Sequence, residues 1–378
     1  MTAVEFVSLE AAGDEKIKIV EHEVTGSSYN PVGNVIDIGR EETVQNSNGA
    51  VTDACNIMAL CNDARLIGHD SLEQSDTGSA GGKKALQDAS TVQYTIEGEP
   101  TEAALLCLVE KLGPTDNMDQ LESSPSILST QNYKHFANRW NRYATLEFDR
   151  TRKSMSVLVK EQIEGDDASS HSSKLLVKGA PNMLIQRCTH AKLRDGNIVP
   201  LSSEIRNQIE ESIVSIGGRA LRCIGLAMKD GGALDKGLLY ENEQYNEILK
   251  DSSKFADIET GLTFVGLVAI RDPPRPGVSE SIDLCKRAGI RVIMITGDAK
   301  ATAVAIARDV HILPDQDNTS PGPGTRAFEG KEFLALPESR QLELLKDDNL
   351  VICRAEPSDK QRLVKMLQKL DEIPAMTG

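Results

Sequence analysis

The second part of the chain alternates regularly between strand-like and helix-like segments, and this alternation limits the folds open to it. After residue 262, apolar runs typical of buried strands are followed by segments with helical periodicity. The runs are LTFVGLVAI (262–270), IRVIMI (290–295), LVIC (350–353) and IPAMTG (373–378). Repeated strand–helix units predict a parallel sheet with right-handed crossovers. Ligands of such sheets bind where strands end at their carboxyl side.

The first part of the chain mixes the two periodicities. ATLEFDRTRKSMSVLVK (144–160) predicts two strands around a charged turn, and KLLVKGAP (174–181) predicts a short strand that ends at Gly and Pro. PTEAALLCLVEKLG (100–113) predicts a helix with Pro at its start and Gly at its end. We therefore expect an α/β chain with two domains, residues 1–271 and 272–378.

Several polar stretches predict loops, because their composition offers little apolar surface to bury. They lie near residues 69–91, 113–131, 164–173 and 314–326. SAGGKK, inside the first of them, lacks the spacing of a phosphate-binding loop.

Composition describes an ordinary globular protein and argues against some partners. Hydrophobic residues make up 39% and charged residues 26% of the chain. The net charge of −15 argues against nucleic acid and against an anionic membrane surface. No apolar run approaches the roughly 18 residues of a membrane helix. The seven cysteines are dispersed and form no CxxC motif, which indicates reduced thiols in a cytosolic setting. The cysteines and histidines lack the spacing of zinc ligands, so the sequence predicts no zinc site.

Residues at the expected carboxyl edge of the sheet could bind a phosphoryl group. MITGDAK places Thr296, Gly297 and Asp298 between a strand and a helix, where free N–H groups favour phosphate. A plain turn with Asp298 as N-cap explains this motif equally well. RAEPSDK places Arg354 at a strand end and Lys360 in a first helical turn, where a cation is favourable beside a bound anion. A solvated surface lysine is the alternative.

Two local signals concern the backbone of this second part. IRDPPRPGV (270–278) fixes the chain after a buried strand and predicts a stiff hinge between domains, with Asp272 and Arg275 beside the prolines. An ordinary proline turn is the alternative. SDKQRLVKMLQKL (358–370) predicts a helix with Ser358 as its N-cap.

A set of motifs in a fixed order resembles the large cytosolic loop of P-type cation-transporting ATPases. The motifs are VKGAP, RDPPR, IRVIMITGD, RAEPSDK and a terminal AMTG. CNDA (61–64), GEPTEAALLCLVEK (98–111), TLEFDRTRKSMSV (145–157) and LRCIGLA (221–227) are similar to the sarco/endoplasmic-reticulum-type calcium pumps. The resemblance implies a mixed α+β nucleotide-binding domain inserted into a phosphorylation domain of the haloacid-dehalogenase type, whose parallel sheet carries helices on both faces. It also implies Mg-ATP as substrate, with transfer of the γ-phosphoryl group to an aspartate before hydrolysis drives ion transport.

The resemblance also implies an ATP-binding set of residues. Phe148 is similar to the aromatic that stacks on adenine, Lys178 to the lysine lining the adenine pocket, and Glu102 to the acid near the adenine amino group. Without the resemblance each would be interpreted as a strand, core or surface residue. The full expected set is Glu102, Phe148, Arg150, Met155, Lys178, Gly179, Arg222, Asp272 and Arg354.

Four further residues are implied in the phosphoryl chemistry. Thr296 and Gly297 resemble donors to the transferred group, Asp298 its neighbouring carboxylate, and Lys360 the lysine that neutralises it. Two positions depart from the family pattern. Asn182 follows KGAP, where an acid is usual, and Ala299 follows TGD, where Asn is usual.

The family's phosphorylated aspartate belongs to DKTGT and its principal Mg²⁺ carboxylate to DGVNDAP, and neither motif occurs in the sequence. We therefore expect a partial phosphorylation domain that lacks the aspartyl-phosphate strand and the Mg-binding loop. Such a chain should bind nucleotide without phosphorylating itself, and its Mg²⁺ ligands should lie outside it.

The expected partners are ATP and the remainder of a pump, namely its actuator and transmembrane domains. The expected location is the cytosolic face of a membrane, the endoplasmic reticulum, in the parent protein, with this chain itself soluble. Two alternatives stay open. One is a non-catalytic nucleotide-sensing or interaction module. The other is a soluble phosphatase of the dehalogenase type, which needs an Asp-x-Asp at a strand end that no expected strand offers.

Overall fold

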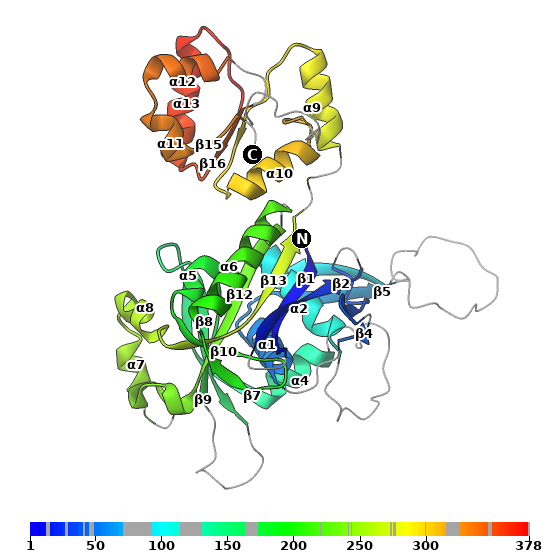
Figure 1. The fold of residues 1–378 in the computed structure, drawn as a ribbon, viewed down its shortest axis with the longest axis vertical. Helices are drawn as coiled ribbons and strands as arrows, with labels where there is room; N and C mark the ends of the chain where they lie inside the picture. Colours follow the sequence, from blue (N-terminus) through cyan, green and yellow to red (C-terminus); the bar gives the residue numbers. More distant parts are fainter. Residues whose placement is uncertain are drawn as a thin grey trace, which may run out of the picture. The chain divides into compact units, whose positions relative to one another are not determined.

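The chain forms two compact units in a computed structural model (Figure 1). One comprises Met1–Ile213 and Cys223–Arg271, and the other Val214–Arg222 and Asp272–Gly378. The structure describes residues 1–12, 16–26, 29–40, 42–44, 49–70, 92–113, 131–162, 173–219, 221–240, 242, 244–272, 274, 277–298, 300–314, 326–346 and 350–376.

The first unit is built on a large, mainly antiparallel sheet. In spatial order its strands are β4 (Glu42–Thr43), β3 (Val35–Asp37), β2 (Ile17–Val24), β1 (Thr2–Ala11), β13 (Leu262–Arg271), β12 (Leu221–Asp230), β9 (Ser173–Gly179), β8 (Ser154–Glu161) and β7 (Trp140–Asp149). Strand β10 (Cys188–Lys192) pairs parallel with β13 and antiparallel with β11 (Ile198–Pro200). Strands β5 (Arg65–Asp70) and β6 (Val92–Glu97) form a separate hairpin.

Strands β8 and β9 are buried on both faces of this sheet. Alternate residues of β8 and β9, such as Val157 and Leu176, join a core with α1 (Ala50–Leu60), α2 (Pro100–Lys111) and α4 (Gln131–Arg139). The intervening residues Leu158, Leu175 and Val177 are buried as well, so the opposite face is also covered. Other described α-helices are α5 (Pro181–Ile185), α6 (Ser203–Gly218), α7 (Tyr245–Ile248) and α8 (Phe255–Ile258). The residues of α6 from Val214 onward are grouped with the second unit.

The second unit contains a parallel sheet in the order β14 (Met294–Ile295), β16 (Leu350–Cys353) and β15 (Arg326–Glu329). Val351 and Cys353 cluster with residues of α9 (Val278–Arg287) and α10 (Lys300–Asp309). Leu350 and Ile352 cluster instead with α11 (Gly330–Ala335), α12 (Glu338–Leu344) and α13 (Pro357–Lys369). Because neighbouring residues of a strand point to opposite faces, helices cover both sides, as predicted.

Some local predictions were wrong. The stretch 290–295 forms a strand only at Met294–Ile295, and both residues are half-buried. Residues 373–376 form no strand, and Ile373 is 99% exposed. Pro374 lacks the N–H that a sheet neighbour would require. Thr377 and Gly378 lie outside the described residues, as do Arg275, Ala299 and most of each predicted polar loop.

The N-cap prediction for α13 was also wrong. The cap is Glu356, two residues before Ser358, and the helix begins at Pro357. A capping box of Glu356 with Asp359 satisfies the first N–H groups, which leaves Ser358 inside the first turn. Over the described stretches, no helix has the length and apolar character needed to cross a bilayer.

Candidate functional site

An ion pair on the sheet of the first unit brings together two residues of the expected ATP set. Lys178, the penultimate residue of β9, places its Nζ 2.5 Å from Oε1 of Glu102 in the first turn of α2. Lys178 pairs in register with Met155 on β8. Cross-strand partners share a face of the sheet, so Met155 and Lys178 both point toward the side covered by α1 and α2.

Glu102 is held in place by the segment that follows α1. Its Oε2 accepts the backbone N–H of Asp63 at 3.0 Å, and its backbone carbonyl accepts the side-chain amide of Asn62 at 2.9 Å. Asp63 in turn accepts from Arg142 of β7 at 2.7 Å. The CNDA and GEPTEA motifs, about forty residues apart, therefore meet at one carboxylate. No sequence pattern pointed to a role for Arg142.

Phe148 lies in an irregular part of β7. Leu146 pairs with Ser156 and Asp149 pairs with Ser154, so two residues, Glu147 and Phe148, lie opposite Met155 alone. Phe148 is 60% exposed, which is unusual for an aromatic residue in a sheet. Because its ring is so exposed, Phe148 is not a core residue. Arg150, in the turn after β7, is also exposed.

Gly179 is required by a close approach of the backbone. A Cβ there would lie 2.5 Å from the carbonyl oxygen of Lys153 and 2.8 Å from Cβ of Ser154. The same carbonyl accepts the N–H of Ala180 at 2.9 Å. Lys153 itself adopts a left-handed φ of 53° and is exposed beside this site, a residue that the sequence analysis did not select.

A cysteine lies next to the ion pair but is not a nucleophile. Cys61 is buried, and its thiol donates to the carbonyl of Met155 at 3.4 Å. Burial raises the pKa of the Cys61 thiol to about 11, although Lys178 acts in the opposite direction. The thiol therefore stays protonated at neutral pH.

In the second unit, the expected phosphoryl-binding loop is joined to the loop after β16. The N–H groups of Arg354 and Ala355 donate to the carbonyls of Asp298 and Thr296 at 2.9 and 3.0 Å. The Thr296 hydroxyl donates to Oδ2 of Asp298 at 2.7 Å and accepts the Asp298 N–H at 3.1 Å. Lys360 lies half-buried in the first turn of α13, directly after this junction. The carboxyl edge of the sheet thus carries Thr296, Gly297, Asp298 and the start of the helix that bears Lys360. The alternation of strands and helices in the sequence predicts this location.

Asp298 is the carboxylate that the expected phosphoryl-binding residues bring to this edge. In the described part of the chain, no three His, Cys, Asp or Glu side chains gather as metal ligands would. Asp298 supplies one carboxylate, and one of its oxygens already accepts from Thr296. Arg354 has a left-handed φ of 48° and lies 3.5 Å from Glu329. Arg222, Asp272 and Arg354 belong to the second unit, and their roles beside ATP stay predictions.

Comparison with known proteins places the whole chain. Residues 50–277 match the family model of the P-type ATPase cytoplasmic domain N, and residues 200–373 match that of haloacid dehalogenase-like hydrolases. The chain is 37% identical over 390 residues to an endoplasmic reticulum-type calcium-transporting ATPase of Arabidopsis thaliana, covering 100% of this chain and 33% of that protein.

An endoplasmic reticulum calcium ATPase of Aspergillus fumigatus is also 37% identical, over 387 residues, with 100% of this chain and 35% of that protein covered. The chain therefore spans about a third of the length of the curated relatives it matches. The family models agree with the resemblance drawn from the motifs, as do the mainly antiparallel sheet of the first unit and the parallel sheet of the second. The chain belongs to the P-type ATPase family.

Proposed function

We propose that this chain is the ATP-binding catalytic loop of a P-type calcium-transporting ATPase, and that adenine binds beside Phe148, Lys178 and Glu102. The observation that carries the proposal is the ion pair between Lys178 and Glu102 beside an exposed aromatic residue. On β8, Met155 has Lys178 of β9 as its cross-strand partner on one side and the exposed Phe148 of β7 on the other. Strands β7 and β9 thus supply an aromatic face and a cation on either side of β8, and helix α2 supplies the carboxylate.

The chemistry of this group suits a purine base. An exposed phenyl ring offers a stacking face, worth about 1–3 kcal/mol per base. Glu102 can accept from an exocyclic amino group, and Lys178 can donate to a ring nitrogen or a phosphate oxygen. Both charged side chains are mostly buried, since 14% of the Glu102 side chain and 10% of the Lys178 side chain is exposed. Their positions are therefore fixed before a ligand arrives.

The second unit supplies the proposed phosphoryl-binding edge. Thr296 and Gly297 would donate to the phosphoryl oxygens, and Lys360 would neutralise their charge, so that catalysis proceeds by positioning and electrostatics. Because no DKTGT occurs in the sequence, we propose that this chain alone binds ATP without forming an aspartyl phosphate. Calcium transport on the cytosolic side of the endoplasmic reticulum membrane, with actuator and transmembrane domains as partners, is proposed for the pump that contains such a loop.

Calorimetric titration of the chain with ATP tests the nucleotide site. We expect saturable binding, weakened about tenfold by Phe148→Ala through loss of stacking. Ile198→Ala is the matched control, because Ile198 is also an exposed apolar strand residue of the first unit, at 46% exposure. Wild-type protein that binds no ATP, or an unchanged affinity in Phe148→Ala, would overturn the site. Incubation with γ-labelled ATP should leave no acid-stable label.

A further inference from the structure

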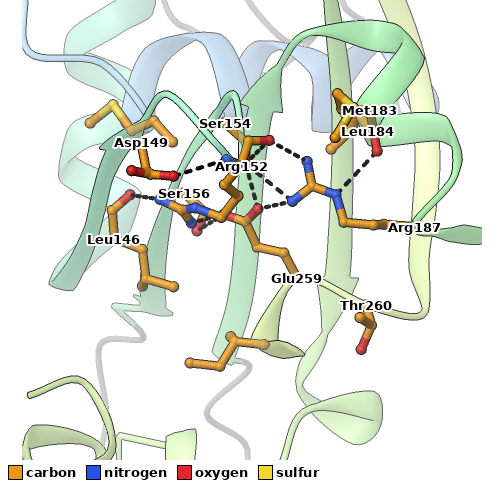
Figure 2. Close-up of polar contacts among 12 residues, drawn as sticks. Leu146, Asp149, Arg152, Ser154, Ser156, Met183, Leu184, Arg187, Glu259 and Thr260 are labelled. Carbon is orange, nitrogen blue, oxygen red and sulfur yellow. Dashed lines mark hydrogen bonds and ion pairs between the residues drawn. The ribbon is translucent and has the colours of Figure 1, made fainter. Parts of the chain in front are cut away.

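A buried carboxylate, Glu259, lies at the centre of a hydrogen-bond network in the first unit (Figure 2). It directly follows α8 and has 0% exposed surface. Oε1 accepts from the Arg152 guanidinium and from the Ser156 hydroxyl at 2.7 Å. Oε2 accepts from the Arg187 guanidinium and from the Ser154 hydroxyl at 2.6 Å. Four donors thus satisfy the two oxygens, which offsets much of the desolvation cost of the buried charge.

The arginines extend this network to the main chain of β7. Arg152 Nη2 donates to the carbonyl of Leu146 at 3.3 Å and also to the carbonyl of Glu147. Arg187 Nη2 donates to the carbonyl of Arg152 at 3.1 Å. Leu146 and Glu147 directly precede Phe148. The buried carboxylate therefore holds, through one guanidinium, the backbone that carries the exposed aromatic ring.

That backbone needs support from outside the strand ladder. Glu147 and Phe148 are the two residues that face a single residue of β8, and a bulge of this kind disrupts the regular ladder locally. The Arg152 guanidinium supplies donors at this point. Arg152 is buried beside its carboxylate partner and over the ring of Phe255, at 5.3 Å from its centroid, so it has little freedom to move.

The network and the proposed base site lie on opposite faces of β8. Side chains alternate along a strand, so Ser154 and Ser156 point away from the face shared by Met155 and Lys178. Glu259 bonds to Ser154 and Ser156 and is fully buried. It can therefore influence a bound nucleotide only through the position of the β7–β8 backbone.

We propose that Glu259 is a positioning residue for adenine recognition: with Arg152 and Arg187 it fixes the β7 bulge and so presents the Phe148 ring to the base. This inference rests on the nucleotide site proposed above. Loss of the Glu259 charge should weaken the part of ATP binding that depends on the base. The part that depends on the phosphates should remain, because the network reaches no residue proposed to bind them.

The test uses the full chain and compares two ligands, ATP and inorganic tripolyphosphate, by calorimetry. We expect Glu259→Gln to weaken ATP binding about tenfold, because loss of a charged hydrogen-bond partner leaves two buried arginines without their anion. Tripolyphosphate affinity should change by less than about twofold. Glu161→Gln is the matched control, since Glu161 ends β8, the strand that bears Ser154 and Ser156, and pairs with Arg139 at 2.8 Å near the surface. It should leave both affinities unchanged.

A double-mutant cycle with Phe148→Ala separates positioning from general stability. If Glu259 acts through the aromatic ring, Glu259→Gln should add no further loss of ATP affinity once Phe148 is removed. Ser156→Ala, which removes one donor and no charge, should weaken ATP binding about two- to threefold and show the same dependence on Phe148. This milder variant decides the question if circular dichroism shows that Glu259→Gln does not fold.

A folded Glu259→Gln variant with wild-type ATP affinity would overturn the inference while the nucleotide site stands. So would losses that add fully in the Phe148→Ala background. Equal weakening of ATP and tripolyphosphate would also contradict it, because it would show a general effect on the unit. Wild-type protein that fails to bind ATP would instead overturn the proposed function, and this inference with it.

Discussion

Lys178 and Glu102 join the end of β9 to the first turn of α2 through an ion pair of 2.5 Å. The two side chains are separated by 76 positions in the sequence. Both side chains are mostly buried, so removal of either one would leave the other charge without a partner and with little access to water. The pair therefore links the stability of the first unit to the proposed contacts with adenine.

Replacing Lys178 with Met should lower both stability and ATP affinity. The variant leaves the Glu102 carboxylate partly buried without its cation, and such an unpaired group costs about 1–3 kcal/mol of unfolding free energy. Adding Glu102→Gln should recover most of this stability but none of the ATP affinity. Urea unfolding and calorimetry measure the two effects. Lys250→Met, which breaks an exposed pair with Glu247, is the control and should change neither.

The two sequence periodicities and the motifs predicted much of this arrangement. Alternating apolar residues predicted β7, β8 and β9, and the resemblance named Lys178 and Glu102 separately. Their pairing could not be predicted, because no local pattern determines which helix end meets which strand. Glu259 was missed for the same reason. Its partners Arg152 and Arg187 lie 107 and 72 residues away, and a lone glutamate after a short helix carries no signal.

Gly179→Ala should destabilise the first unit. The new methyl group would lie 2.5 Å from the Lys153 carbonyl oxygen, and this neighbour is backbone that cannot rotate away. We expect a loss of about 1–3 kcal/mol in unfolding free energy, measured by urea titration. Gly232→Ala is the control, since a Cβ there meets nothing within 4 Å. Equal stability of the two variants would show that β9 can shift to admit a side chain.

The first unit should lose stability in mild acid because of His22. Burial lowers the pKa of this imidazole to about 4 from an ordinary value of 6.5, and the nearby Arg194 adds to the effect. His22 is fully buried, and its Nε2 lies 2.7 Å from the Ser8 hydroxyl. Between these two pKa values the unfolded chain binds a proton that the folded chain does not. The free energy of unfolding therefore falls as the pH decreases through this window.

The expected contribution of His22 is about 2 kcal/mol between about pH 7 and about pH 5. Urea unfolding at the two pH values measures it, with His22→Gln as the comparison because glutamine can keep a bond to Ser8 but does not titrate. The wild type should lose more stability than the variant over this range. Parallel losses in both proteins would assign the acid sensitivity to other groups.

The capping box of α13 can be tested by two neighbouring substitutions. Glu356→Ala removes the side chain that caps the helix, and this should cost about 0.5–2 kcal/mol of local stability. Ser358→Ala should be almost neutral, because Ser358 lies inside the first turn and not at the cap. Hydrogen exchange of the α13 amides reports both effects. The reverse order of effects would restore Ser358 as the N-cap, as the sequence suggested.

The second unit should exchange its amide hydrogens faster than the first. Protection follows burial and the number of neighbouring elements that hold a segment. None of the described residues of α9 is buried, and β14 has two half-buried residues and, among the described strands, pairs with β16 alone. Strands β8 and β9, in contrast, lie inside a large sheet with both faces covered. We expect exchange in α9 and β14 to be at least about tenfold faster than in β8 and β9.

Mass-spectrometric exchange on the full chain gives this comparison within one sample. Strand β16 serves as the internal reference, because all four of its residues are buried and it has a neighbour on each side. It should be protected more strongly than β14, although both belong to the same sheet. Equal protection of β14 and β8 would contradict the prediction, since it would mean that burial of the strand itself does not limit opening in this unit.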